Sequence, residues 1–177
     1  MNFKDGGEGL LIPDHTILCV GKYSGKIIRA GKVIEEFEDA NLVVNQGLNH
    51  ILNVEFDAAT QLTNWYLGIY KANYTPVATD TAANIASNST ESADYTSATR
   101  PVWTPAASTA QSITNSASQA TFTFNASITV YGAFLISNST INGTAGTLFG
   151  AALFATPKAV VNTDQLLLTY TFNAASA

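Results

Sequence analysis

Apolar and polar residues alternate along much of this chain, which is the pattern of half-buried β-strands. From residue 17 to 37 the alternation is interrupted by glycines, and it predicts two or three strands with a tight hairpin turn at 30–32. Further strands are predicted in QATFTFNASITVYGAFLISNS, GTLFGAALFAT and QLLLTYTFNAA, between residues 119 and 175. The pattern predicts an all-β domain, a β-sandwich of jelly-roll type with about eight strands.

One short segment has a helical period instead. In NLVVNQGLNHILN the apolar residues that fall on one helical face are Val44, Leu48, Ile51 and Leu52. They predict a helix near residues 42–53, and Asp39 or Asn41 precedes it as a candidate N-cap.

Two neighbouring segments differ from the half-buried strands. NWYLGIY at 64–70 is apolar on both faces, which predicts a strand buried between two layers. Residues 73–108 contain Pro76, Pro101 and Pro105, which prevent long regular pairing. We expect a long loop excursion there, with one helical turn near 80–86.

The first sixteen residues show no period and contain GGEG at 6–9 and Pro13 followed by Asp14. They predict an extended N-terminal arm at 1–16, ahead of a single β-sandwich domain at 17–177. The arm has no apolar stretch followed by a small-residue cleavage site, so no secretory signal is expected.

Charge narrows the possible partners. The net charge is −5, so phosphate backbones and anionic lipid surfaces would repel the chain, and no apolar run approaches the ~20 residues that cross a bilayer. We therefore expect neither nucleic-acid nor membrane binding. Residues 1–40 hold twelve charged groups, whereas 101–177 hold only Lys158 and Asp164. Such an uncharged surface is typical of one that other protein covers.

Residue types that carry chemistry are sparse. His15, His50 and the single Cys19 form no metal-ligand pattern, and we expect Cys19 to be a small buried hydrophobe. No serine stands in a G-x-S-x-G motif, and the acidic run from Glu35 to Asp39 is expected to be a solvated charge run at a strand end. We predict no catalytic residue, metal or cofactor, and a protein that is not an enzyme.

Several stretches resemble a known family. They are EEFEDANLVVNQGLNHILN, TNWYLGIY, RPVWTP at 100–105, SQATFTFNA at 118–126 and YGAFL at 131–135. Together they resemble small head-associated virion proteins of tailed phages, mainly short-tailed ones, over roughly residues 25–177. The resemblance implies a jelly-roll-like capsid cement or decoration protein that binds across neighbouring major capsid subunits of an HK97-type shell. It carries over no functional residue.

The expected function is thus to stabilise the expanded head from the outer capsid surface, after synthesis in the host bacterial cytoplasm. The expected partners are the major capsid protein and further copies of this chain, as a dimer or a trimer. The arm residues expected to touch the capsid are Asn2, Phe3, Leu10, Leu11 and Ile12. The alternative is a carbohydrate-binding, receptor-binding head domain of a phage tail or tail fibre.

Overall fold

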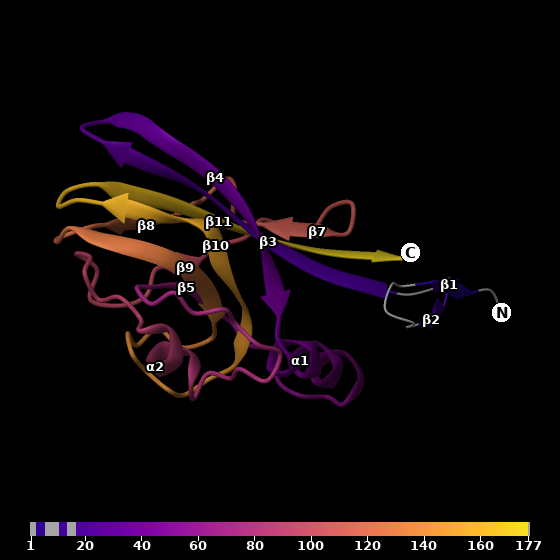
Figure 1. Ribbon diagram of the computed structural model, residues 1–177. Coiled ribbons are helices and arrows are strands. Elements are labelled where there is room, and N and C mark those ends of the chain that lie inside the picture. Colours follow the sequence, from indigo (N-terminus) through magenta and orange to yellow (C-terminus); the bar gives the residue numbers. More distant parts are fainter. Residues whose placement is uncertain (1–2, 6–10, 14–16, 177) are drawn as a thin grey trace.

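The computed structural model describes residues 3–5, 11–13 and 17–176 (Figure 1). Within these residues the helices are α1 (Asn45–Phe56) and α2 (Ile85–Ser89). The strands are β1 (Phe3–Asp5), β2 (Leu11–Pro13), β3 (Ile17–Arg29), β4 (Lys32–Val43), β5 (Trp65–Tyr70), β6 (Val102–Trp103), β7 (Ser112–Thr114), β8 (Ala120–Thr123), β9 (Ile128–Ile136), β10 (Leu148–Val160) and β11 (Gln165–Ser176).

Nine of the strands form one antiparallel sheet that curls on itself. Its order is β6-β5-β9-β10-β4-β3-β11-β7, with β8 also paired to β11. The curl makes the two halves of the sheet face each other, and the Tyr23 hydroxyl on β3 donates across them to the Gly150 carbonyl on β10 at 3.2 Å. In the same way Trp103 on β6 donates its indole N–H to the Tyr170 carbonyl on β11 at 3.1 Å. The result is the predicted all-β, jelly-roll-like sandwich.

The main core lies between the two halves of this sheet. Alternate residues of each strand point inward and are fully buried, as a period of two requires. They include Tyr23, Leu67, Ile69, Phe122, Val130, Phe154, Leu166, Leu168 and Tyr170.

A second core covers the outer face of β5, β9 and β10. Tyr70 and Phe134 face outward from the sheet and pack with Ile85 of α2, which belongs to the long excursion after β5. Strand β5 is therefore buried on both faces, as its sequence predicted. The two cores make a three-layer body in which this half of the sheet is the middle layer (Figure 1).

The β3–β4 hairpin turns where the sequence predicts it. Ala30 and Gly31 connect the strands, and both have positive φ, at 49° and 75°. Two consecutive positive φ values are what a two-residue turn needs to match the right-handed twist of its strands.

The predicted position of the helix was wrong by three residues, since α1 begins at Asn45 and not near residue 42. Leu42 and Val43 pair with Ala151 and Gly150 of β10, so sheet pairing prevents an earlier start. Asp39 and Asn41 lie inside β4 and do not cap α1. The helical turn expected near 80–86 is α2, which begins only at Ile85.

The predicted arm is described only in part. Phe3 pairs with Pro13 and Asp5 with Leu11, so β1 and β2 form a small antiparallel sheet of their own. Asn2 and Leu10 lie outside the described residues, and the arm as a whole stays a prediction. Neither of the two helices in the described residues has the length and apolarity that a membrane crossing needs.

A substitution of Gly132 on β9 tests how tightly the middle layer packs. A Cβ added there would collide with the Ala152 backbone carbonyl and the Tyr70 ring. We expect Gly132→Ala to lower the free energy of unfolding by about 1–3 kcal/mol, measured by urea denaturation. Gly31→Ala is the control, because open space surrounds Gly31 and only its positive φ should cost about 1 kcal/mol. Equal losses would contradict close packing at Gly132.

Candidate interaction surface

Charged side chains are almost absent from the surface of residues 58–176. This range contains seven charged residues: Lys71, Asp80, Glu91, Asp94, Arg100, Lys158 and Asp164. Five of them are buried, and the other two, Lys71 and Asp94, are half-buried and paired with each other at 2.7 Å. We call the exposed part of residues 58–176 the neutral surface.

Among the side chains that the structure describes, the exposed charge lies instead on the β3–β4 hairpin and at the end of α1. Across the hairpin Lys22 pairs with Glu38, and Lys26 with Glu36, each at 2.8 Å. The acidic run was expected at a strand end and lies in the interior of β4, where Glu35 pairs with Ile27 and Asp39 with Tyr23 of β3. The expected position was wrong because β4 is long, whereas the expected exposure holds for Glu36 and Glu38, whose side chains are 61% and 60% exposed.

Two members of the acidic run serve as partners within the fold. Glu35 accepts from the buried Lys158 ammonium at 2.7 Å, and the buried Asp39 carboxylate accepts from the Ala155 backbone N–H at 2.7 Å. Both connect β4 to β10. The charge of Lys158 is thus neutralised by a carboxylate from the charged N-terminal part.

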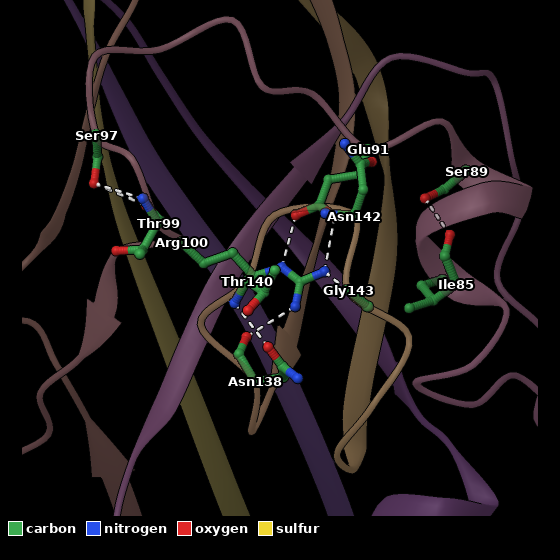
Figure 2. Close-up of polar contacts among 10 residues, drawn as sticks. All are labelled: Ile85, Ser89, Glu91, Ser97, Thr99, Arg100, Asn138, Thr140, Asn142 and Gly143. Carbon is green, nitrogen blue, oxygen red and sulfur yellow. Dashed lines mark hydrogen bonds and ion pairs between the residues drawn. The ribbon is translucent and has the colours of Figure 1, made fainter.

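The most deeply buried polar contact joins Glu91 to Arg100 (Figure 2). Two parallel hydrogen bonds of 2.7 Å connect the guanidinium to the carboxylate, and both side chains are 0% exposed. Figure 2 shows how loop 137–147 closes around the pair. Arg100 donates to the Asn138 and Gly143 carbonyls at 2.8 and 3.3 Å, and Glu91 accepts from the Asn142 N–H at 2.6 Å.

This ion pair has a structural and not a chemical role. Arg100 also lies over the Phe134 ring, at 5.3 Å from its centroid. With water excluded and both carboxylate oxygens engaged, Glu91 cannot reach a substrate. The pair instead fastens the excursion after β5 to the loop between β9 and β10.

Removing one partner should therefore be costly. We expect Arg100→Met to lower the free energy of unfolding by about 3–5 kcal/mol, because it leaves a buried carboxylate without its counter-charge. The exposed pair supplies a matched control, since Lys22→Met should cost no more than about 1 kcal/mol. Urea denaturation of both variants measures the difference, and similar losses would contradict the structural role of the buried pair.

Another buried carboxylate, that of Asp164, holds the turn between β10 and β11. Asp164 accepts two hydrogen bonds from the Arg29 guanidinium, of 3.0 and 2.7 Å, and one of 2.9 Å from the Val161 N–H. The Arg29 hydrogen bonds hold the pKa of Asp164 below its usual value, and burial opposes them only in part. Asp164 thus stabilises the fold in its ionised form.

The sign of this shift predicts an acid-dependent contribution to stability. Because the folded pKa is depressed, the contribution is complete above the unfolded pKa of about 3.9 and is lost as the pH falls through the folded pKa. We expect Asp164→Asn to be less stable than the natural chain at pH 7 and the gap to narrow in acid, by urea denaturation at each pH. Asp57→Asn, an exposed control, should show little difference at either pH. A gap for Asp164→Asn that is independent of pH would contradict this assignment.

The other candidate chemical residues are not brought together. His50 packs edge-on against Trp65 with ring centroids 5.5 Å apart, and His15 lies outside the described residues. Within the described part of the chain, no three His, Cys, Asp or Glu side chains are close enough to hold a metal ion. Cys19 was expected to be buried and is half-exposed, because it lies near the projecting start of β3.

An apolar pocket of about 230 Å³ opens at one end of the sandwich. Its walls are Ile51, Trp65, Trp103, Ile113, Leu135, Phe149, Tyr170 and Phe172. Trp65 and Phe172 each meet Phe149 edge-to-face, with centroids 5.4 and 5.1 Å apart. A sugar needs hydrogen-bond partners for its hydroxyls, and these walls offer almost none. The pocket therefore suits an apolar group and gives no support to a carbohydrate site.

Exposed apolar side chains gather near the same end. Ile17 is 74% exposed on β3, and Phe56 is 80% exposed at the end of α1. Sequence reasoning missed both, although the uncharged run ILCV at 17–20 was a usable signal. Of the predicted capsid contacts, only the backbones of Phe3, Leu11 and Ile12 are described.

No protein-family model matches the chain, and no curated protein matches it. The neutral surface, the apolar pocket and the exposed start of β3 are therefore interpreted from their own residues.

Proposed function

We propose that this chain is a virion structural protein, a capsid cement protein that binds the outer surface of the major capsid protein lattice and stabilises the expanded head. The neutral surface is the observation that carries the proposal. On a capsid, many identical copies lie close to one another and to the shell, so exposed like charges would repel. A surface whose charged side chains are buried or paired avoids this repulsion, both toward the shell and toward neighbouring copies.

The close packing of the body also supports this role. A protein that braces neighbouring subunits must resist deformation, and close-packed interiors transmit strain with little compression. Here two cores fill a three-layer body, and the Glu91–Arg100 pair fastens its longest excursion. The exposed Ser, Thr and Asn side chains would supply hydrogen bonds to the shell without adding charge.

The N-terminal arm is proposed as a second contact. Its residues Asn2, Phe3, Leu10, Leu11 and Ile12 are mostly apolar, and an extended segment can add main-chain hydrogen bonds to an exposed sheet edge. An interface of ~1,600 Å² in total would suffice for stable attachment, and body and arm can share it.

The test is the ratio of this protein to the major capsid protein in purified virions, measured by quantitative mass spectrometry. A shell-covering role requires a copy number comparable to that of the capsid subunit. A ratio equal to that of a portal or tail component would overturn the proposal and favour the receptor-binding head domain.

A binding experiment distinguishes attachment from co-purification. The purified chain should co-sediment with expanded shells that lack it, and should not co-sediment with unexpanded procapsids of the same phage. Its binding to the shells should change little when the salt concentration is raised, because screening acts on charges and the neutral surface exposes only the paired Lys71 and Asp94. Binding that salt abolishes would show that charged residues outside the neutral surface make the contact.

A further inference from the structure

Strand β3 has an open edge at its beginning. On one side β11 pairs with it along its whole length up to Ile17. On the other side β4 accompanies it only from Gly21, which pairs with Asn41, because the next residues of β4 pair with β10. In the described part of the chain, no strand lies on this side of Ile17–Val20.

The side chains of this four-residue edge are apolar on both faces. Ile17 is 74%, Leu18 47% and Val20 51% exposed. Figure 1 shows this part of β3 and the end of β11 reaching together away from the body. We call residues 17–20 and 173–176 the ribbon. At the inner end of the ribbon Asn173 also pairs with Ser112 of β7, so only its outer end has two strands. Two strands are marginally stable alone in water, and exposed apolar side chains on both faces favour a partner.

The inner face of the ribbon continues into the apolar pocket. Gly21 pairs with Phe172, which lines the pocket, and Cys19 pairs with Ala174 two positions further out. Because side chains alternate along a strand, Cys19 and Ile17 lie on the same face as Phe172. Ribbon and pocket therefore form one apolar tract at one end of the molecule.

We propose that a second copy of this chain occupies the open edge, so that two copies pair antiparallel along Ile17–Val20. An antiparallel pair of identical strands has a two-fold axis, so the contact closes on itself and forms a dimer. Since that axis is perpendicular to the sheet, Ile17 and Cys19 of both copies lie on the same face and extend the apolar tract of each pocket. The dimer does not rest on the proposed capsid role.

Charge favours a second copy as the occupant. Like charges directly opposite each other destabilise paired strands, and in an antiparallel pair of identical strands the residues near the two-fold axis lie beside their own copies. The ribbon residues ILCV and NAAS carry no charge, whereas Lys22 and Lys26 of the same strand are already covered by β4 and paired with its glutamates. The only uncovered part of this edge of β3 is thus the part that can meet its own copy without repulsion.

Two valines provide a matched test. Val20 on the ribbon and Val33 on the hairpin are each 51% exposed and each lie in a strand. Sedimentation velocity of the full chain over a concentration series should show a monomer–dimer equilibrium. Val20→Lys should raise the dimer dissociation constant at least about tenfold, because it places two lysines near the two-fold axis. Val33→Lys should leave the constant unchanged.

Cys19, the only cysteine of the chain, gives a second readout that needs no disruptive change. A short bis-maleimide should join two natural chains through Cys19 into a covalent dimer, and Val20→Lys should reduce its yield while Val33→Lys should not. The circular dichroism of each variant reports whether it is folded. A chain that is monomeric at every concentration, a trimer, or a dimer that Val20→Lys does not weaken would overturn the proposal. A dimer in solution with no binding to capsids would leave it standing and reject only the capsid role.

Discussion

The change of partner by β4 between Asn41 and Leu42 is the constraint on which the rest of the structure depends. Up to Asn41 this strand belongs to the half of the sheet with β3, and from Leu42 it belongs to the half with β10. Close approach at this corner requires glycines, because a Cβ on Gly21 or Gly150 would collide with the Asn41 side chain. This change of partner lets one sheet curl into a sandwich. It also fixes the start of α1 after Val43, and among the described residues it leaves the edge of β3 at Ile17–Val20 unpaired.

The distribution of charge follows a similar division of the chain. The N-terminal part supplies partners for buried charges elsewhere, as Arg29 does for Asp164 and Glu35 for Lys158. Within the excursion, Glu91 and Arg100 neutralise each other. Because a buried charge is tolerated only when it is paired and hydrogen-bonded, these contacts let the surface lose its charge while the fold stays intact.

Much of the fold could be predicted because a strand leaves a local pattern of alternating apolar and polar residues in the sequence. The period-two pattern located β3, β9 and β11, and the two apolar faces of 64–70 located the strand that is buried on both sides. The start of α1 could not be predicted, because nothing local shows that Leu42 and Val43 are held by β10, far away in the sequence. The pairing of Glu91 with Arg100 was equally invisible, since nothing local distinguishes two buried charges from two exposed ones. The exposure of residues 17–20 could not be predicted either, because it depends on the point where β4 leaves β3 to pair with β10.

The neutral surface has a thermal consequence. Contacts made without charge rest on apolar burial and on hydrogen bonds between uncharged groups. The apolar part weakens on cooling, because the hydrophobic effect near room temperature is driven by the entropy of water. Cooling is therefore expected to weaken an assembly that is held through this surface, whereas a higher salt concentration is not.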